Sequence, residues 1–281
     1  MELCDLEIWC YDCEVFAHDW IFVFESPGGE KTHFWNDPES LALFVDENEG
    51  SLFAGYNSSR YDQYILKAVL AGCDPEQVKE VNDWIIAGNT PWEHAYLADF
   101  YFRFNDVDLM KDVQMGTSLK SIEGHASMSV EESSVPFDID RPLTAEERAD
   151  VLEYCEHDVD AARVLLGMRG DYLSTKLALA ERAGLAPERA LALTNAKLTA
   201  AVLRASQVPH DDERAYAVPA NLRTELIPDE VIEFFARVGD EEIPDEELWS
   251  MKLEIEVGGC PVTLGFGGIH GALPRYREVA G

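Results

Sequence analysis

Apolar and aromatic residues surround two carboxylates in the stretch 8–16, Ile-Trp-Cys-Tyr-Asp-Cys-Glu-Val-Phe. This composition favours a strand, and strand side chains alternate between faces, so Asp12 and Glu14 are predicted to point the same way. Two acids aimed at one spot from an apolar strand lose hydration unless a positive charge lies there, and a divalent metal ion is the natural candidate. Acids are 54 of 281 residues, so the spacing alone indicates little.

The same patterns predict alternating strands and helices through residue 170. We expect strands over 3–10, 20–24, 32–35, 52–56 and 106–109, the first three forming an antiparallel meander. Capping residues predict helices beginning near Asp37, after the turn 57–59, near Asp74, at Ser118 and at the Thr144–Glu147 capping box, the last running to about Met168.

The character of the chain changes after Gly170. Residues 172–206 are rich in Ala and Leu and are predicted to be helical, with breaks at Gly184 and Pro187. One more helix is expected near 228–237, then a strand over 251–257 and a glycine-rich stretch, 265–271. We therefore predict an α/β domain over 1–170 and a mainly helical extension over 171–281.

Two later motifs add to the acid pair. Asp62 lies at a predicted strand-to-helix junction, and Tyr154 and Asp158 share one face of the long helix because residues four apart are about 40° apart around it. Four carboxylates from three distant places fit a two-metal site, in which paired ions activate a water and stabilise a leaving phosphodiester oxygen. Each motif alone is a weak indication of such a site, but the three motifs in this order are a strong one.

Charge and composition limit the partners. A net charge of −32 argues against a protein that grips nucleic acid by bulk electrostatics, because polyanion binding normally uses a basic surface. Any nucleic-acid role must rest on metals, stacking and a few placed cations. No apolar run is long enough to span a membrane, so we expect no membrane partner and a cytoplasmic location.

The ordered set resembles the DEDD exonuclease superfamily, whose fold is ribonuclease-H-like. That resemblance implies that Asp12, Glu14, Asp62 and Asp158 hold two Mg²⁺ or Mn²⁺ ions and that Tyr154 positions the attacking water or the phosphate. The histidine branch of the superfamily has its histidine at the position of Glu153, so the chain looks like the tyrosine branch, typical of proofreading domains. His157 is then expected at the surface or in support of the site.

A closer resemblance is to the N-terminal 3′→5′ exonuclease portion of phage-type family B DNA polymerases. In those relatives, the residues matched by Asn57, Tyr61, Ser118 and Leu119 contact single-stranded DNA. They also often carry a lysine shortly before the third motif; none lies between Ser121 and Ala149 here, and Lys120 could substitute. The stretch 265–271 is similar to the connector between exonuclease and polymerase modules, and the polymerase palm motifs are absent.

The leading hypothesis is therefore a proofreading-type exonuclease acting on DNA 3′ ends, located in the host cytoplasm if phage-encoded. A separate polymerase chain is a possible partner. Two alternatives remain open: a standalone exoribonuclease of the same superfamily, and a non-catalytic DNA-binding or assembly module of a split polymerase.

Overall fold

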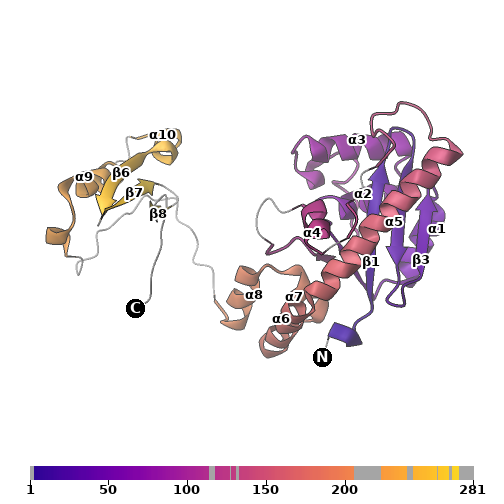
Figure 1. The fold of residues 1–281 in the computed structure, drawn as a ribbon, viewed down its shortest axis with the longest axis horizontal. Coiled ribbons are helices and arrows are strands. Elements are labelled where there is room, and N and C mark those ends of the chain that lie inside the picture. Colours follow the sequence, from indigo (N-terminus) through magenta and orange to yellow (C-terminus); the bar gives the residue numbers. More distant parts are fainter. Residues whose placement is uncertain are drawn as a thin grey trace. The chain divides into compact units, whose positions relative to one another are not determined.

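The computed structural model describes residues 3–113, 118–126, 128–130, 133–205, 223–238, 243–257, 259–265 and 268–271. The chain divides into two compact units, residues 1–206 and residues 207–281. Each unit contains its own sheet together with helices (Figure 1).

A five-stranded mixed sheet forms the centre of the first unit. Its strands, in chain order, are β1 (Ile8–Val15), β2 (Trp20–Glu25), β3 (Lys31–Trp35), β4 (Leu52–Gly55) and β5 (Asp106–Asp108). Their order in the sheet is β3-β2-β1-β4-β5, with β1, β2 and β3 antiparallel and β1, β4 and β5 parallel. The predicted antiparallel meander is confirmed, and β1 lies at the centre of the sheet.

Helices cover both faces of this sheet. The helices of the first 168 residues are α1 (Pro38–Glu47), α2 (Asp62–Leu70), α3 (Pro75–Ile86), α4 (Leu119–His125) and α5 (Ala145–Met168). The long helix α5 crosses one face diagonally, while residues of α1, α2 and α3 share an apolar core with the opposite face (Figure 1). The predicted α/β architecture is thus present.

Local capping signals explain where most helices begin. The Asp37 carboxylate accepts the Ser40 backbone N–H at the start of α1, and a capping box joins Thr144 to Glu147 at the start of α5. Side-chain oxygens at these positions satisfy N–H groups that have no partner inside the helix. Both predicted starts are confirmed.

Two local expectations are wrong. Residues Leu3–Asp5 form a short 3₁₀ helix, and the first strand begins only at Ile8. The turn at 57–59 does not cap α2, whose N-cap is Tyr61. The Ser58 and Ser59 hydroxyls instead donate to the carboxylates of Asp106 and Asp108 on β5. The two hydroxyls thus bind buried carboxylates on a neighbouring strand and do not cap the N–H groups that begin α2.

Three further helices complete the first unit: α6 (Gly170–Ala183), α7 (Pro187–Ala192) and α8 (Asn195–Val202). Gly184 ends α6 with φ 66°, a left-handed conformation that glycine adopts readily. Proline at the first position of α7 follows the same logic. The predicted breaks are confirmed, and these helices lie within the compact unit that ends at residue 206.

The second unit combines short helices with a small sheet. Its described elements are a 3₁₀ turn (Thr224–Leu226), α9 (Asp229–Val238), α10 (Asp245–Ser250), β6 (Lys252–Val257), β7 (Cys260–Gly265) and β8 (Gly268–Gly271). The strand predicted over 251–257 is present as β6; it pairs antiparallel with β7, which pairs antiparallel with β8. Residues 266–267 of the predicted connector lie outside the described residues. Over the described ranges, no helix is both long and apolar enough for a membrane span.

Candidate metal centre

The two acids of β1 lie where this strand has lost its partner on one side, and they face α5. β1 pairs with β4 only over Ile8–Cys10, whereas its pairing with β2 continues to Val15. Asp12 and Glu14 therefore lie on the part of β1 beyond its last partner on β4. Their same-face neighbours, Cys10 and Phe16, belong to the core beneath α5. Both acids face α5, and the predicted shared orientation is confirmed.

Helix α5 brings a third acid to this pair. Ligand oxygens of Asp12, Glu14 and Asp158 all lie within 4.8 Å of one another. Asp158 is buried, while Asp12 and Glu14 are partly buried. Three oxygen donors at this spacing suit hard cations such as Mg²⁺ or Mn²⁺. Asp158 lies 144 positions after Glu14 and 146 after Asp12, and the three form one potential ligand set because α5 crosses β1.

The three acids repel one another. Burial raises the pKa of Asp12 well above its usual range, and the charges of Asp62, Glu14 and Asp158 raise it further. Burial also raises the pKa of Glu14, reinforced by Asp158 and Asp62 and opposed by Lys120. A divalent cation would reverse this effect, because an opposite charge favours the ionised carboxylate. The donor set and its electrostatics therefore fit a bound metal.

Asp62 approaches from the opposite side of β1. Asp62 is the first residue of α2, and its carboxylate accepts a hydrogen bond from the Cys13 thiol at 3.3 Å. Burial raises the pKa of Asp62 to about 7. Its oxygens lie outside the close group of three, yet among the neighbouring charges that of Asp62 raises the pKa of Asp12 the most. Asp62 is thus beside the predicted centre without joining its tightest cluster.

The loop that delivers Asp62 depends on a close backbone approach. A Cβ on Gly55, the last residue of β4, would lie 2.8 Å from the Ser58 Cβ and 3.1 Å from the Tyr11 carbonyl oxygen. Asn57 follows with φ 60°, a conformation that asparagine tolerates better than most residues. These two residues turn the chain sharply from β4 toward α2.

Two buried free thiols flank the acids. Cys13 lies on the face of β1 opposite to Cys10, as its odd spacing predicts, and points to Asp62. On α5, the Cys155 thiol lies 3.6 Å from Asp12 Oδ2 and donates a weak hydrogen bond to it. Burial raises the pKa of both thiols, so they stay protonated as donors at neutral pH.

Lys120 supplies a cation next to the acids. Its ammonium lies 2.6 Å from Asp158 Oδ1 and 3.3 Å from Glu123 Oε1. It also sits over the Tyr154 ring, 4.8 Å from the centroid. Lys120, Tyr154 and Asp158 thus form one cluster in the structure. Burial raises the pKa of the Tyr154 hydroxyl, and the charge of Asp158 raises it further.

The residues expected to guide a strand are spread around this cluster. Ser118 caps α4 by accepting the Ser121 N–H, and Leu119 is the first residue of that helix. The Tyr61 hydroxyl donates to Asn82 at 2.6 Å, and its ring packs partly against the core beneath α2. Asn57 lies in the loop before α2 and is partly buried. Tyr61 therefore has one partner within the protein before any substrate binds.

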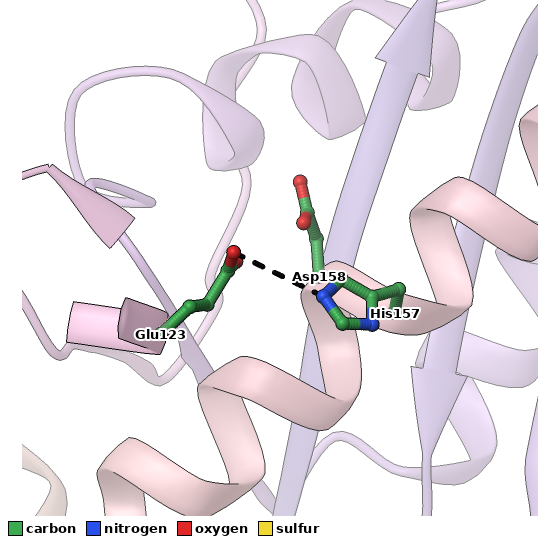
Figure 2. A group of neighbouring side chains, drawn as sticks. All are labelled: Glu123, His157 and Asp158. Carbon is green, nitrogen blue, oxygen red and sulfur yellow. Dashed lines mark ion pairs between the residues drawn. The ribbon is translucent and has the colours of Figure 1, made fainter. Parts of the chain in front are cut away.

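Two polar residues lie near Asp158: Glu123, to which the sequence assigned no role, and His157, which was expected only at the surface or in support of the site. Glu123 on α4 and His157 on α5 form, with Asp158, a second group whose ligand atoms lie within 4.8 Å of one another. One signal was available: Glu123 follows Lys120 by three residues, a spacing that joins charges on a helix. Figure 2 shows how Glu123 reaches toward the His157 ring.

No protein-family model and no curated protein sequence matches the chain. The functional interpretation therefore depends on the residues and their geometry.

Proposed function

We propose that this chain is a metal-dependent 3′→5′ exonuclease that removes nucleotides from DNA 3′ ends. In this proposal it has a ribonuclease-H-like fold and resembles the exonuclease portion of phage-type family B DNA polymerases. The four acids Asp12, Glu14, Asp62 and Asp158 hold two divalent ions, Mg²⁺ or Mn²⁺.

The observation that carries the proposal is the convergence of Asp12, Glu14 and Asp158. Their oxygens gather within 4.8 Å although they come from a central strand and a helix far along the chain. The raised pKa of Asp12, caused by burial and then by neighbouring carboxylates, indicates that the fold accepts a strong repulsion at this point. Such clusters of perturbed acids are typical of functional sites. The mixed sheet flanked by helices is also what the resemblance implies.

The reaction is hydrolysis of the terminal phosphodiester. A water oxygen attacks phosphorus, the bond to the 3′ oxygen breaks, and that oxygen takes up a proton, releasing a nucleoside 5′-monophosphate. Bound divalent ions would lower the pKa of the water and stabilise negative charge on the leaving oxygen.

The chain's own residues would orient the reactants. The Tyr154 hydroxyl keeps its proton at neutral pH because burial and then Asp158 raise its pKa, so it can donate a hydrogen bond to water or phosphate. Lys120, beside Asp158 and Tyr154, offers a positive charge to a phosphate oxygen. Asn57, Tyr61, Ser118 and Leu119 would guide the single strand. Contacts of this kind do not require a basic surface, which the charge of −32 argues against.

The test is hydrolysis of a 5′-labelled single-stranded DNA by the full chain. We expect stepwise shortening from the 3′ end with Mg²⁺ or Mn²⁺ and none with EDTA. Asp12→Ala should lower the rate at least about a thousandfold, equivalent to roughly 4 kcal/mol of transition-state stabilisation. Glu153→Ala is the matched control, because Glu153 is an exposed acid on α5 next to Tyr154.

Unchanged hydrolysis by a folded, highly purified Asp12→Ala sample would overturn the proposal, as would no hydrolysis by folded wild-type protein with either metal. An RNA of the same sequence, run in parallel, distinguishes a deoxyribonuclease from an exoribonuclease.

A further inference from the structure

A second cluster of possible metal ligands lies on the other side of Asp158. Glu123 projects from α4 toward α5, where it meets the His157 ring beside the Asp158 carboxylate (Figure 2). One nitrogen or oxygen atom from each of these residues lies within 4.8 Å of the other two. None of the residues proposed for hydrolysis other than Asp158 takes part in it.

Two atoms of this cluster lack hydrogen-bond partners. Over the described part of the chain, Glu123 Oε2 and His157 Nε2 are buried and neither has a partner within hydrogen-bond distance. The Glu123 side chain has no exposed surface, and that of His157 is 14% exposed. A buried polar atom without a partner is unfavourable, so such atoms call for an explanation. Here the two unsatisfied atoms face each other.

The separation of these atoms suits a shared cation better than a direct hydrogen bond. Glu123 Oε2 lies 3.9 Å from His157 Nε2, which is beyond hydrogen-bond length. Two ligands that are each about 2.0–2.1 Å from one tetrahedral Zn²⁺ lie roughly 3.3 Å apart. A shift of a few tenths of an ångström on each side would therefore place both atoms on one ion.

Lys120 does not account for the unsatisfied atoms. Its ammonium contacts the other Glu123 oxygen, Oε1, at 3.3 Å and Asp158 Oδ1 at 2.6 Å. Lys120 balances part of the negative charge, which leaves Glu123 Oε2 and His157 Nε2 available.

The donor atoms determine the class of ion. An imidazole nitrogen with two carboxylate oxygens favours borderline transition ions such as Zn²⁺, whereas an all-oxygen set favours Mg²⁺. We propose that Glu123, His157 and Asp158 form a transition-metal site that takes Zn²⁺, adjacent to the oxygen-only centre of Asp12, Glu14 and Asp158. His157 was expected at the surface or in a supporting role, and this proposal makes it a ligand. The site does not depend on whether the chain hydrolyses DNA.

The test measures Zn²⁺ binding directly. The full wild-type chain is stripped of metal, equilibrated with excess MgCl₂ and titrated with ZnCl₂ against a chromophoric chelator. We expect one tight Zn²⁺ per chain. Glu123→Gln and His157→Gln should each weaken it by more than about a hundredfold, because even residues that only support a metal ligand contribute 10–100-fold.

Three control variants should keep the tight Zn²⁺ site. Glu153→Gln and His33→Gln change an exposed acid and an exposed histidine. Asp12→Asn changes the oxygen-only centre and leaves Glu123 and His157 intact. Circular dichroism of every variant establishes that it is folded.

A nitrogen-proton NMR spectrum of the imidazole side chains provides a measurement on the wild-type protein alone. Addition of one equivalent of ZnCl₂ should shift the His157 Nε2 resonance, assigned by its loss in His157→Gln. Equal affinity in wild type and both ligand variants would overturn the proposal. So would loss of the tight site in Asp12→Asn with retention in Glu123→Gln, or absence of tight Zn²⁺ binding by the folded wild type.

Discussion

Asp19 and Asp12 are both acids of the first unit that lie close to α5 or to the residues that begin it. Asp19 is surrounded by hydrogen-bond donors, whereas Asp12 is surrounded mainly by other acids. Asp19, in the turn between β1 and β2, is fully buried and accepts the Leu143 N–H at 2.7 Å, the Asn36 amide at 2.8 Å and the Arg148 guanidinium. From the described residues, Asp12 receives only a long thiol contact, from Cys155, and it lies among other carboxylates.

The contrast separates two uses of a buried acid. Asp19 joins the β1–β2 turn to the residues that begin α5, and each of its oxygens has a donor, so its charge is compensated within the protein. Asp12 and Glu14 are not compensated in this way: burial raises the pKa of both, neighbouring carboxylates raise it further, and only Lys120 partly opposes the rise for Glu14. We infer that Asp19 has a structural role and that Asp12 and Glu14 bind an external cation.

The largest expected effect is on hydrolysis, in Glu14→Gln. Removing one charge from the proposed metal ligands should lower the rate about a thousandfold, or roughly 4 kcal/mol. The same change relieves repulsion with Asp158, so the metal-free protein should melt at the same temperature or higher. Hydrolysis assays and thermal melts in EDTA check both parts. A clear fall in the melting temperature would place Glu14 with Asp19 as a structural acid.

Asp19→Ala should show the reverse pattern. The change leaves the Leu143 N–H and Arg148 without their acceptor, and we expect the free energy of unfolding to fall by about 2–4 kcal/mol. Hydrolysis per folded molecule should stay near the wild-type rate. Chemical denaturation measures the first quantity, with Asp140→Ala as control because the Asp140 side chain is 92% exposed. A stability equal to wild type would contradict the structural role of Asp19.

Stability of the metal-free protein should depend on pH in the direction set by the site acids. Burial raises the pKa of Asp62 to about 7, and unfolded aspartate titrates near 4. Between these values the folded chain binds more protons than the unfolded chain, so stability falls as pH rises from about 4 to about 7.

Thermal melts in EDTA across that range test this dependence. Asp62→Asn should flatten the curve, and added MgCl₂ should raise the melting temperature most at the upper end, where the carboxylates are ionised. A melting temperature that rises steadily to pH 7 in EDTA with the same slope in Asp62→Asn would contradict the prediction.

The smallest effect is expected in Ser58→Ala. Asp106 on β5 is intermediate between the two extremes, because one oxygen accepts the Ser58 hydroxyl at 2.6 Å and the Tyr11 hydroxyl at 2.9 Å. Loss of one such bond should lower the free energy of unfolding by about 1 kcal/mol. The pKa of Asp106, which burial raises to about 6, should rise further, since the Ser58 hydrogen bond lowers it. Denaturation and carboxyl NMR titration measure the two shifts.

The sequence by itself determined most elements of the first unit, because their signals are local. Strand alternation placed Asp12 and Glu14 on one face, and capping residues located the starts of α1 and α5. The start of α2 could not be read in this way, because Ser58 and Ser59 are drawn to acids on a strand almost 50 residues later. The pairing of β6 with β7 likewise could not be read from the sequence.

The tertiary structure alone decided which of many acids gather. The chain has 54 acids, and spacing does not distinguish the compensated Asp19 from the uncompensated Asp12. The crossing of α5 over β1 brings Asp158 to Asp12 and Glu14, and the packing of α4 against α5 brings Glu123 to His157. Such contacts depend on how helices pack across a sheet, and a periodic pattern within one segment carries no information about that.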